Sequence, residues 1–161
     1  LLAGFRAARG RIVVTLDGDL QNNPADIPAL LERIPEFDAA VGYRRNRADG
    51  LVRRVSSRVG NAVRNAISGD DIIDTGCTLK AFRRECLAGL PGFKGMHRFL
   101  PTLIRMAGFR VCQVAVGHRP RVAGRSKYGI GNRLLPTMVD LMAVRWMKSR
   151  RITPGEIEEI R

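Results

Sequence analysis

The 161-residue sequence has few of the features that mark secreted or membrane-spanning proteins. Its cysteines, Cys77, Cys86 and Cys112, occur in no CxxC or CxxH spacing, which argues against a disulfide framework or a zinc site. No run reaches the roughly 18 apolar residues that a transmembrane helix needs, and no signal-peptide pattern opens the chain. We therefore expect a cytoplasmic protein with no transmembrane span in this chain.

Acidic residues are scarce relative to basic ones. The chain contains 15 Asp and Glu against 28 Lys and Arg, which gives a formal net charge of +13. Such an excess indicates a polyanionic partner, which can be nucleic acid, nucleotide phosphates or an anionic membrane surface. Aromatic residues make up only 6%, whereas surfaces for single-stranded nucleic acid interleave aromatic and basic residues. We expect no nucleic-acid partner, but a basic nucleic-acid-binding module stays an alternative.

An acidic segment follows the first predicted strand. The apolar run Ile12 to Leu16 is typical of a buried strand, and it leads directly into Asp17-Gly18-Asp19-Leu20-Gln21. Open α/β sheets bind their ligands beyond the carboxyl ends of strands. Two carboxylates with one glycine between them can turn toward one point, Gln21 can add a neutral oxygen, and such ligands suit Mg²⁺ or Mn²⁺. An acidic turn is the alternative, because Asp and Gly favour turns.

Helical and strand patterns alternate along the chain. Short apolar runs near residues 39–43, 78–82 and 110–116 predict strands, and apolar residues at helical spacing predict helices near 24–34, 52–67 and 96–107. This alternation predicts an α/β domain with a mostly parallel sheet flanked by helices. We place that domain at residues 1–150 and a polar tail at 151–161.

Three further segments carry polar residues that suit a phosphate-bearing substrate. Arg53, Ser57 and Asn61 share one face of the predicted helix 52–67, although solvated surface is the alternative. Asp74 lies among small residues, where a carboxylate can approach a substrate or cap a turn. The segment from His118 to Gly129 combines four cations, a hydroxyl and glycines. Such a loop can close over phosphate groups, or it can be a basic solvated loop.

The last predicted helix, about residues 131–148, is apolar nearly all round. It can pack in the core, which is the commoner outcome. Alternatively it can lie on a bilayer surface, where Trp146 and the cations Lys148, Arg150 and Arg151 suit anionic headgroups. A membrane surface is therefore an expected partner.

Together these segments resemble the dolichol-phosphate mannosyltransferase branch of the family 2 glycosyltransferases, which includes bacterial enzymes that load sugars onto undecaprenyl phosphate. The resemblance runs from about Ala7 to Lys148. It is carried by Asp17 to Gln21 as an Asp-x-Asp-x-Gln motif, the Arg53, Ser57 and Asn61 face, Asp74 with Lys80 to Glu85, His97 to Pro101, and Arg121 with Gly124 to Gly129.

The resemblance implies a Rossmann-like GT-A fold and inverting transfer of a sugar from a UDP- or GDP-linked donor to a dolichyl or undecaprenyl phosphate at the cytoplasmic face of a membrane. It implies that Asp17, Asp19 and Gln21 hold Mg²⁺ or Mn²⁺ at the donor diphosphate. The other implied roles are donor or acceptor binding for Arg53, Ser57, Ser126 and Lys127, and catalysis for Asp74 and Arg121.

Enzymes of this family begin with a strand and a loop that receive the nucleotide base, and no such segment precedes Leu1. We therefore expect the first β-α-β unit of the fold to lie upstream of Leu1. A metal-dependent nucleotidyltransferase, which also uses paired carboxylates, is a further alternative. The Gly-Arg-Ser-Lys-Tyr segment argues against it.

Overall fold

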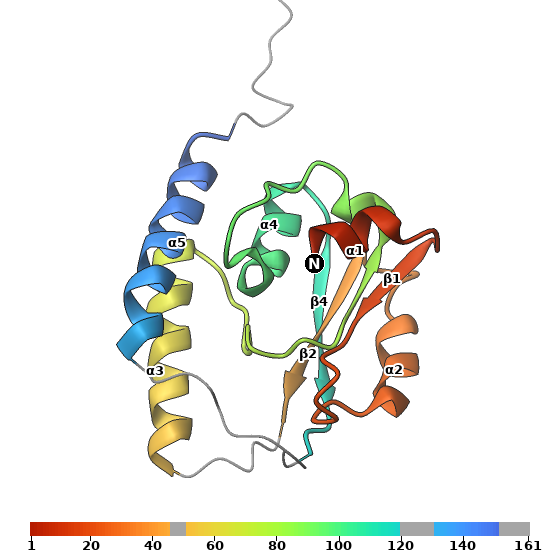
Figure 1. The fold of residues 1–161 in the computed structure, drawn as a ribbon, viewed down its shortest axis with the longest axis horizontal. Coiled ribbons are helices and arrows are strands. Elements are labelled where there is room, and N and C mark those ends of the chain that lie inside the picture. The colour runs from red at the N-terminus through yellow and green to blue at the C-terminus, as the bar shows by residue number, and fades with distance from the viewer. Residues whose placement is uncertain (46–50, 120–130, 152–161) are drawn as a thin grey trace, which may run out of the picture.

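The computed structural model describes residues 1–45, 51–119 and 131–151, and for residues 51–58 and 131–135 it describes the backbone alone. The described residues form one four-stranded sheet in the order β1-β3-β2-β4 (Figure 1). The strands are β1 (Ile12–Thr15), β2 (Ala39–Arg44), β3 (Lys80–Arg83) and β4 (Val111–Val116). The helices are α1 (Leu2–Ala7), α2 (Ile27–Leu31), α3 (Leu51–Ser68), α4 (Leu100–Met106) and α5 (Gly131–Ser149), with short 3₁₀ turns η1 (Pro24–Asp26), η2 (Arg84–Leu87) and η3 (Met96–Arg98).

The sheet is mixed: β1, β2 and β4 run in one direction, in line with the predicted mostly parallel sheet, and β3 runs against them. Strands β2 and β4 are parallel, but β3 runs antiparallel to both of its neighbours, β1 and β2. The first residue of β3, Lys80, lies opposite Thr15, the last residue of β1. The reason is the connector between α3 and β3, which brings the chain to the carboxyl end of β1 before β3 begins. Residues at the start of β3 therefore join the edge of the sheet where the acidic motif lies.

Both faces of the sheet are buried. Side chains alternate along each strand, so every strand contributes residues to both faces. Val41 and Phe82 pack with Phe99 into the cluster beneath α1, α4 and α5. Ala40 and Ala81 point to the opposite face, where they pack with Leu30, Ile34, Leu79 and Val116. Figure 1 shows α2 on this second side of the sheet and α4 on the first. The carboxyl end of β1 therefore lies in a sheet that is packed on both faces.

Helix α5 packs beside α3 at the edge of the molecule (Figure 1). Its cations bind carbonyl oxygens at the end of α3: Arg145 donates to the carbonyl of Ile67 at 2.8 Å, and Lys148 to that of Ser68 at 3.0 Å. These carbonyls have no intrahelical partner, and cations near a helix C-terminus are favourable. No helix in the described part of the chain is long and apolar enough to cross a membrane.

Candidate functional site

A cleft of about 590 Å³ opens at the carboxyl end of β1. It receives residues from the acidic motif, from the connector before β3, from β3 itself and from η3. The lining residues are Leu1, Thr15, Leu16, Asp17, Thr75, Gly76, Thr78, Lys80, His97, Arg98 and Leu100. The mixed sheet brings these segments together, because β3 starts where β1 ends.

The acidic motif forms a tight turn at the mouth of this cleft. Asp17 is exposed, Asp19 is half-buried, and Oδ1 of Asp19 accepts a hydrogen bond from the backbone nitrogen of Gln21 at 3.2 Å. Leu20, between Asp19 and Gln21, has a φ of +62°, which lies in the left-handed region that leucine rarely adopts, and the residue is 66% exposed. A strained residue kept at such a position is typical of functional sites.

The donor set of this turn fits Mg²⁺ or Mn²⁺. Two carboxylates and one amide oxygen are hard ligands, and Mg²⁺ commonly binds one or two protein carboxylates with substrate phosphates and water. The described residues contain no group of three or more His, Cys, Asp and Glu side chains that can hold a metal ion. The motif therefore suits an ion shared with a phosphate-bearing ligand better than one enclosed by protein alone.

Asp74 is buried, and Arg44 binds both of its carboxylate oxygens. Arg44 Nε donates to Oδ2 at 2.6 Å and Nη2 donates to Oδ1 at 2.8 Å. The backbone nitrogens of Arg44 and Gly76 add bonds of 3.3 and 3.1 Å. A bidentate guanidinium pair stabilises the ionised carboxylate, so this geometry is unfavourable for a general base. It supports a role in fixing the Thr75-Gly76 wall of the cleft.

Lys80 is a site residue that the sequence analysis assigned no role. Its side chain is only 3% exposed, it lines the cleft, and its Nζ donates to the carbonyl oxygen of Cys77. Burial lowers the pKa of Lys80, while the nearby Cys77, Asp74 and Asp17 act in the opposite direction. The signal in the sequence is a lysine at the start of an otherwise apolar strand, a place where an unpaired cation is costly.

Two residues of η3 complete the basic side of the cleft. His97 and Arg98 both line it, and Arg98 Nη1 donates to Thr137 Oγ1 of α5 at 2.9 Å. Burial, followed by the charge of Arg98, lowers the pKa of His97, so the neutral imidazole is favoured there. The cleft is therefore lined both by the Asp17 carboxylate and by nitrogen groups of Lys80, His97 and Arg98.

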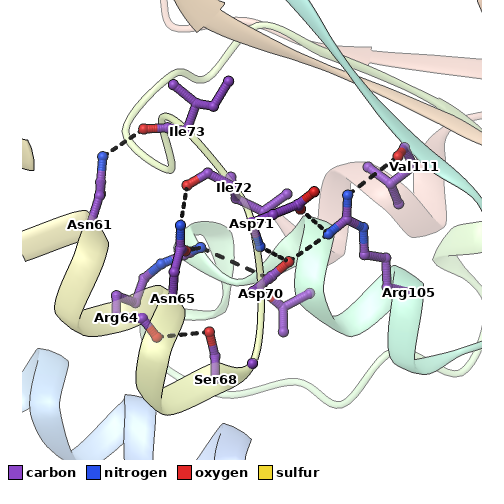
Figure 2. Close-up of polar contacts among 12 residues, drawn as sticks. Asn61, Arg64, Asn65, Ser68, Asp70, Asp71, Ile72, Ile73, Arg105 and Val111 are labelled. Carbon is purple, nitrogen blue, oxygen red and sulfur yellow. Dashed lines mark hydrogen bonds and ion pairs between the residues drawn. The ribbon is translucent and has the colours of Figure 1, made fainter.

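A polar network fixes the connector that leads to Asp74 (Figure 2). Asn61 Nδ2 donates to the carbonyl of Ile73 at 2.6 Å, and Arg105 Nη1 donates to Asp70 Oδ1 at 2.7 Å. Asn61 was predicted to lie on a polar helix face for which solvated surface was the alternative, and in the structure its amide holds the connector. The side chain of Asp70 is 3% exposed, so the network ties the connector to a buried carboxylate.

The basic segment after β4 starts beside the acidic motif. The backbone nitrogen of Arg119 donates to the carbonyl of Gln21 at 2.9 Å. Arg121, Ser126 and Lys127 lie outside the described residues, so their predicted roles stay predictions. The same holds for Arg53 and Ser57, whose backbone belongs to α3 but whose side chains are not described.

Comparison with known proteins identifies the family. The family model "Glycosyl transferase family 2" matches residues 1–90, more than half of the chain. The chain belongs to glycosyl transferase family 2. This membership accounts for an acidic motif at the end of β1, and it favours glycosyl transfer over the nucleic-acid-binding and nucleotidyltransferase alternatives.

Relatives within this family act on polyprenyl phosphates, according to their names. The chain is 38% identical over 158 residues to a dodecaprenyl-phosphate galacturonate synthase of Rhizobium johnstonii, covering 95% of this chain and 46% of the relative. It is 38% identical over 143 residues to an undecaprenyl-phosphate 4-deoxy-4-formamido-L-arabinose transferase of Pseudomonas paraeruginosa, covering 88% and 42%. The chain thus spans less than half the length of these relatives.

Solved structures confirm the GT-A, Rossmann-like α/β fold. Glucosyl-3-phosphoglycerate synthase of Mycobacterium tuberculosis, in complex with Mn²⁺, uridine diphosphate and phosphoglyceric acid, matches with a TM-score of 0.65 at 20% identity. The match covers 96% of this chain and 54% of that chain. At this identity the likeness concerns the fold alone.

Proposed function

We propose that this protein is an inverting glycosyltransferase that moves a sugar from a nucleotide-diphosphate-sugar to a polyprenyl phosphate. The observation that carries the proposal is the cleft at the end of β1, whose lining includes Asp17 of the acidic motif together with Lys80, His97 and Arg98. This pairing of an acidic, metal-suited motif with nitrogen donors is what a diphosphate and its counter-ion need. The names of the relatives supply the polyprenyl phosphate acceptor.

The acidic motif would hold the divalent ion. Asp17 and Asp19 would supply carboxylate oxygens and Gln21 an amide oxygen, with Mg²⁺ or Mn²⁺ as the ion. When bound, the ion supplies positive charge that stabilises the leaving diphosphate. Because the motif is at the open mouth of the cleft, the donor phosphates can share the ion with the protein.

The reaction joins two anions and needs their correct orientation more than it needs a base. An oxygen of the acceptor phosphate attacks the anomeric carbon, and the bond from that carbon to the diphosphate oxygen breaks, so the nucleoside diphosphate leaves with the electron pair. The phosphate is already anionic near neutral pH, so little proton transfer is required. Positioned cations lower the cost of bringing the two anions together.

This chemistry assigns the remaining residues. Arg121, Ser126 and Lys127 would clamp the lipid phosphate and the leaving diphosphate, and Arg53 and Ser57 would bind the phosphates or the acceptor. We assign Asp74 to orientation of the cleft wall through Arg44, because both of its oxygens accept bonds from that guanidinium.

We place the protein at the cytoplasmic face of a membrane, where a polyprenyl phosphate resides. Helix α5 buries Leu141 and Val144 but exposes Val139, Met142 and Trp146, at 68, 49 and 62%. These three lie on one outward stripe at helical spacing. The exposed cations Arg150 and Arg151 follow the stripe, which suits anionic headgroups.

The decisive test is transfer by the full-length protein in detergent or vesicles with Mn²⁺ and undecaprenyl phosphate. The donors are labelled UDP-galacturonate, UDP-4-deoxy-4-formamido-L-arabinose, UDP-glucose and GDP-mannose, because relatives at equal identity carry different sugars. We expect one donor to give a chelator-sensitive lipid-linked sugar, lost in Asp19→Ala and kept in Glu32→Ala, an exposed control. No product with any donor, or an Asp19→Ala variant as active as wild type, contradicts the proposal.

A further inference from the structure

One side-chain hydroxyl holds both ends of the acidic motif. Thr78 lies two residues before β3 begins at Lys80, and its Oγ1 accepts a hydrogen bond from Asn22 Nδ2 at 2.8 Å. The same oxygen accepts a bond from the backbone nitrogen of Asp17 at 3.3 Å. Asp17 opens the motif and Asn22 directly follows it. Both acceptor positions of this hydroxyl are thus used on the motif.

Thr78 and Asn22 are themselves held in place. Thr15 Oγ1 of β1 donates to the carbonyl oxygen of Thr78 at 2.7 Å, across the sheet edge. Asn22 is 7% exposed, and its Oδ1 lies 3.9 Å from the Cys77 sulfur as a thiol acceptor. The anchor is therefore a half-buried hydroxyl in the connector before β3, tied to β1 on one side and to the buried Asn22 on the other.

The motif needs such an anchor for two physical reasons. Asp17 and Asp19 carry like charges that repel each other when no cation is bound. In addition, Leu20 keeps a left-handed backbone at φ +62°, which is unfavourable for a residue other than glycine. A segment released from its anchors would relax toward a wider turn, and its two carboxylates would no longer point to one place.

We propose that Thr78 is the positioning residue of the divalent-cation site, acting through the backbone of Asp17 and the side chain of Asn22. The inference rests on the proposed function, because it concerns the same acidic motif. It predicts that removal of one hydroxyl lowers metal affinity although Thr78 is not a metal ligand. Partners outside the ligand set typically change metal affinity by roughly 10–100-fold.

The test is Mn²⁺ binding by the full-length protein, measured by the electron paramagnetic resonance of free Mn²⁺ in a titration without donor. Thr78→Val keeps the shape of the side chain but removes the acceptor, and we expect the Kd for Mn²⁺ to rise roughly tenfold, the lower end of that range. Thr78→Ser keeps the oxygen and should bind as wild type. Ser149→Ala removes an exposed hydroxyl at the end of α5, outside the lining of the cleft, and should leave the Kd unchanged.

Thermal denaturation without metal separates positioning from general destabilisation. Thr78→Val and Thr78→Ser are expected to melt within a few degrees of each other, so a large difference in Mn²⁺ affinity between them reports on the hydroxyl. If Thr78→Val does not fold, Asn22→Ala decides. It removes one of the two bonds to Thr78 Oγ1 and should raise the Kd by a smaller factor in the same direction.

Three results overturn the inference. Mn²⁺ affinity equal to wild type in Thr78→Val, with Asp19→Ala unable to bind, refutes the anchor and leaves the proposed function standing. Binding by Thr78→Ser as weak as by Thr78→Val shows that the hydroxyl is not the cause. A wild-type protein that binds no Mn²⁺ overturns both the inference and the proposed metal site.

Discussion

The Arg44–Asp74 pair provides the sharpest test of how the cleft is built. The Asp74→Asn variant keeps the size of the side chain but removes its charge, and it places an amide NH₂ group where one oxygen now accepts from Arg44. The guanidinium then loses its counter-ion. The side chains of Arg44 and Asp74 are only 14 and 8% exposed, so water cannot fully replace the lost partner.

The expected loss of stability follows from this burial. Breaking one half of a buried ion pair typically costs about 3–5 kcal/mol, because a charge stays behind unpaired. Arg44 retains some contact with water, so we expect a loss near the lower end, about 3 kcal/mol. For a domain of this size each kcal/mol shifts the melting temperature by about 2–4 °C, which predicts a decrease of about 6–12 °C.

Urea denaturation at pH 7 and calorimetry measure this loss. The matched control is Asp71→Asn, because Asp71 is also paired with an arginine, Arg105, but its side chain is 71% exposed. An exposed pair contributes about 1 kcal/mol or less. Equal losses in the two variants would refute the argument that burial makes the Asp74 pair important.

The same variant distinguishes orientation from base catalysis. If Asp74 orients the cleft wall, Asp74→Asn lowers activity at low temperature by a moderate factor, and the pH profile of kcat keeps its shape. A profile that loses its acidic limb in Asp74→Asn would contradict this assignment. It would show that the carboxylate accepts a proton during the reaction.

Three further predictions concern single residues. Leu20→Val should destabilise the protein by about 1 kcal/mol in urea because a β-branched residue is strained at positive φ, whereas Leu20→Gly should not. Burial lowers the pKa of Lys80 from its usual value of 10.5. Between the lowered pKa and 10.5 the unfolded chain therefore binds more protons at this lysine than the folded protein does. The free energy of unfolding of the wild type should rise with pH in that range. Lys80→Met should reduce this rise in the range just below pH 10.5. The double variant Met142→Ser/Trp146→Ser should lower the affinity for anionic vesicles, measured by co-sedimentation, about tenfold or more, because each apolar side chain buried in the membrane contributes about 1.5–3 kcal/mol. The control Ile73→Ser, at a similarly exposed residue, should leave the affinity unchanged.

Local pattern predicted the elements of the fold well. The strand at Ile12–Thr15, helix α3 and helix α5 lie within a few residues of their expected bounds, because apolar periodicity reports which face of a segment is buried. Of the two alternatives for α5, core packing is met in part, and contact with a bilayer surface stays a prediction. The helix buries Leu141 and Val144 and exposes Val139 and Trp146. Its sequence is apolar nearly all round, so the sequence alone could not predict which side is buried.

Pairings between distant residues could not be predicted in the same way. Arg44 reaches Asp74 across 30 positions, and Asn61 turned out to hold the connector at Ile73. A polar stripe on a helix is compatible with solvent, a ligand or a neighbouring loop, and only the packing of α3 against the connector decides among these. The place of the acidic motif at the end of β1 was predictable, because its carboxylates are adjacent in sequence to the strand and need no long-range partner.

The direction of β3 and the missed residues of the cleft have one cause. A parallel β3 would have placed Thr78 and Lys80 at the far edge of the sheet, away from Asp17. Its antiparallel insertion between β1 and β2 sets Lys80 opposite Thr15, so Thr78 meets the backbone of Asp17 and Lys80 enters the cleft. A pattern of alternating helices and strands does not encode that reversal, because the pattern is the same for either direction. The site therefore depends on a topological choice, and whichever residues stabilise the connector, Asn61 and Arg105 among them, also determine where the metal motif finds its anchor.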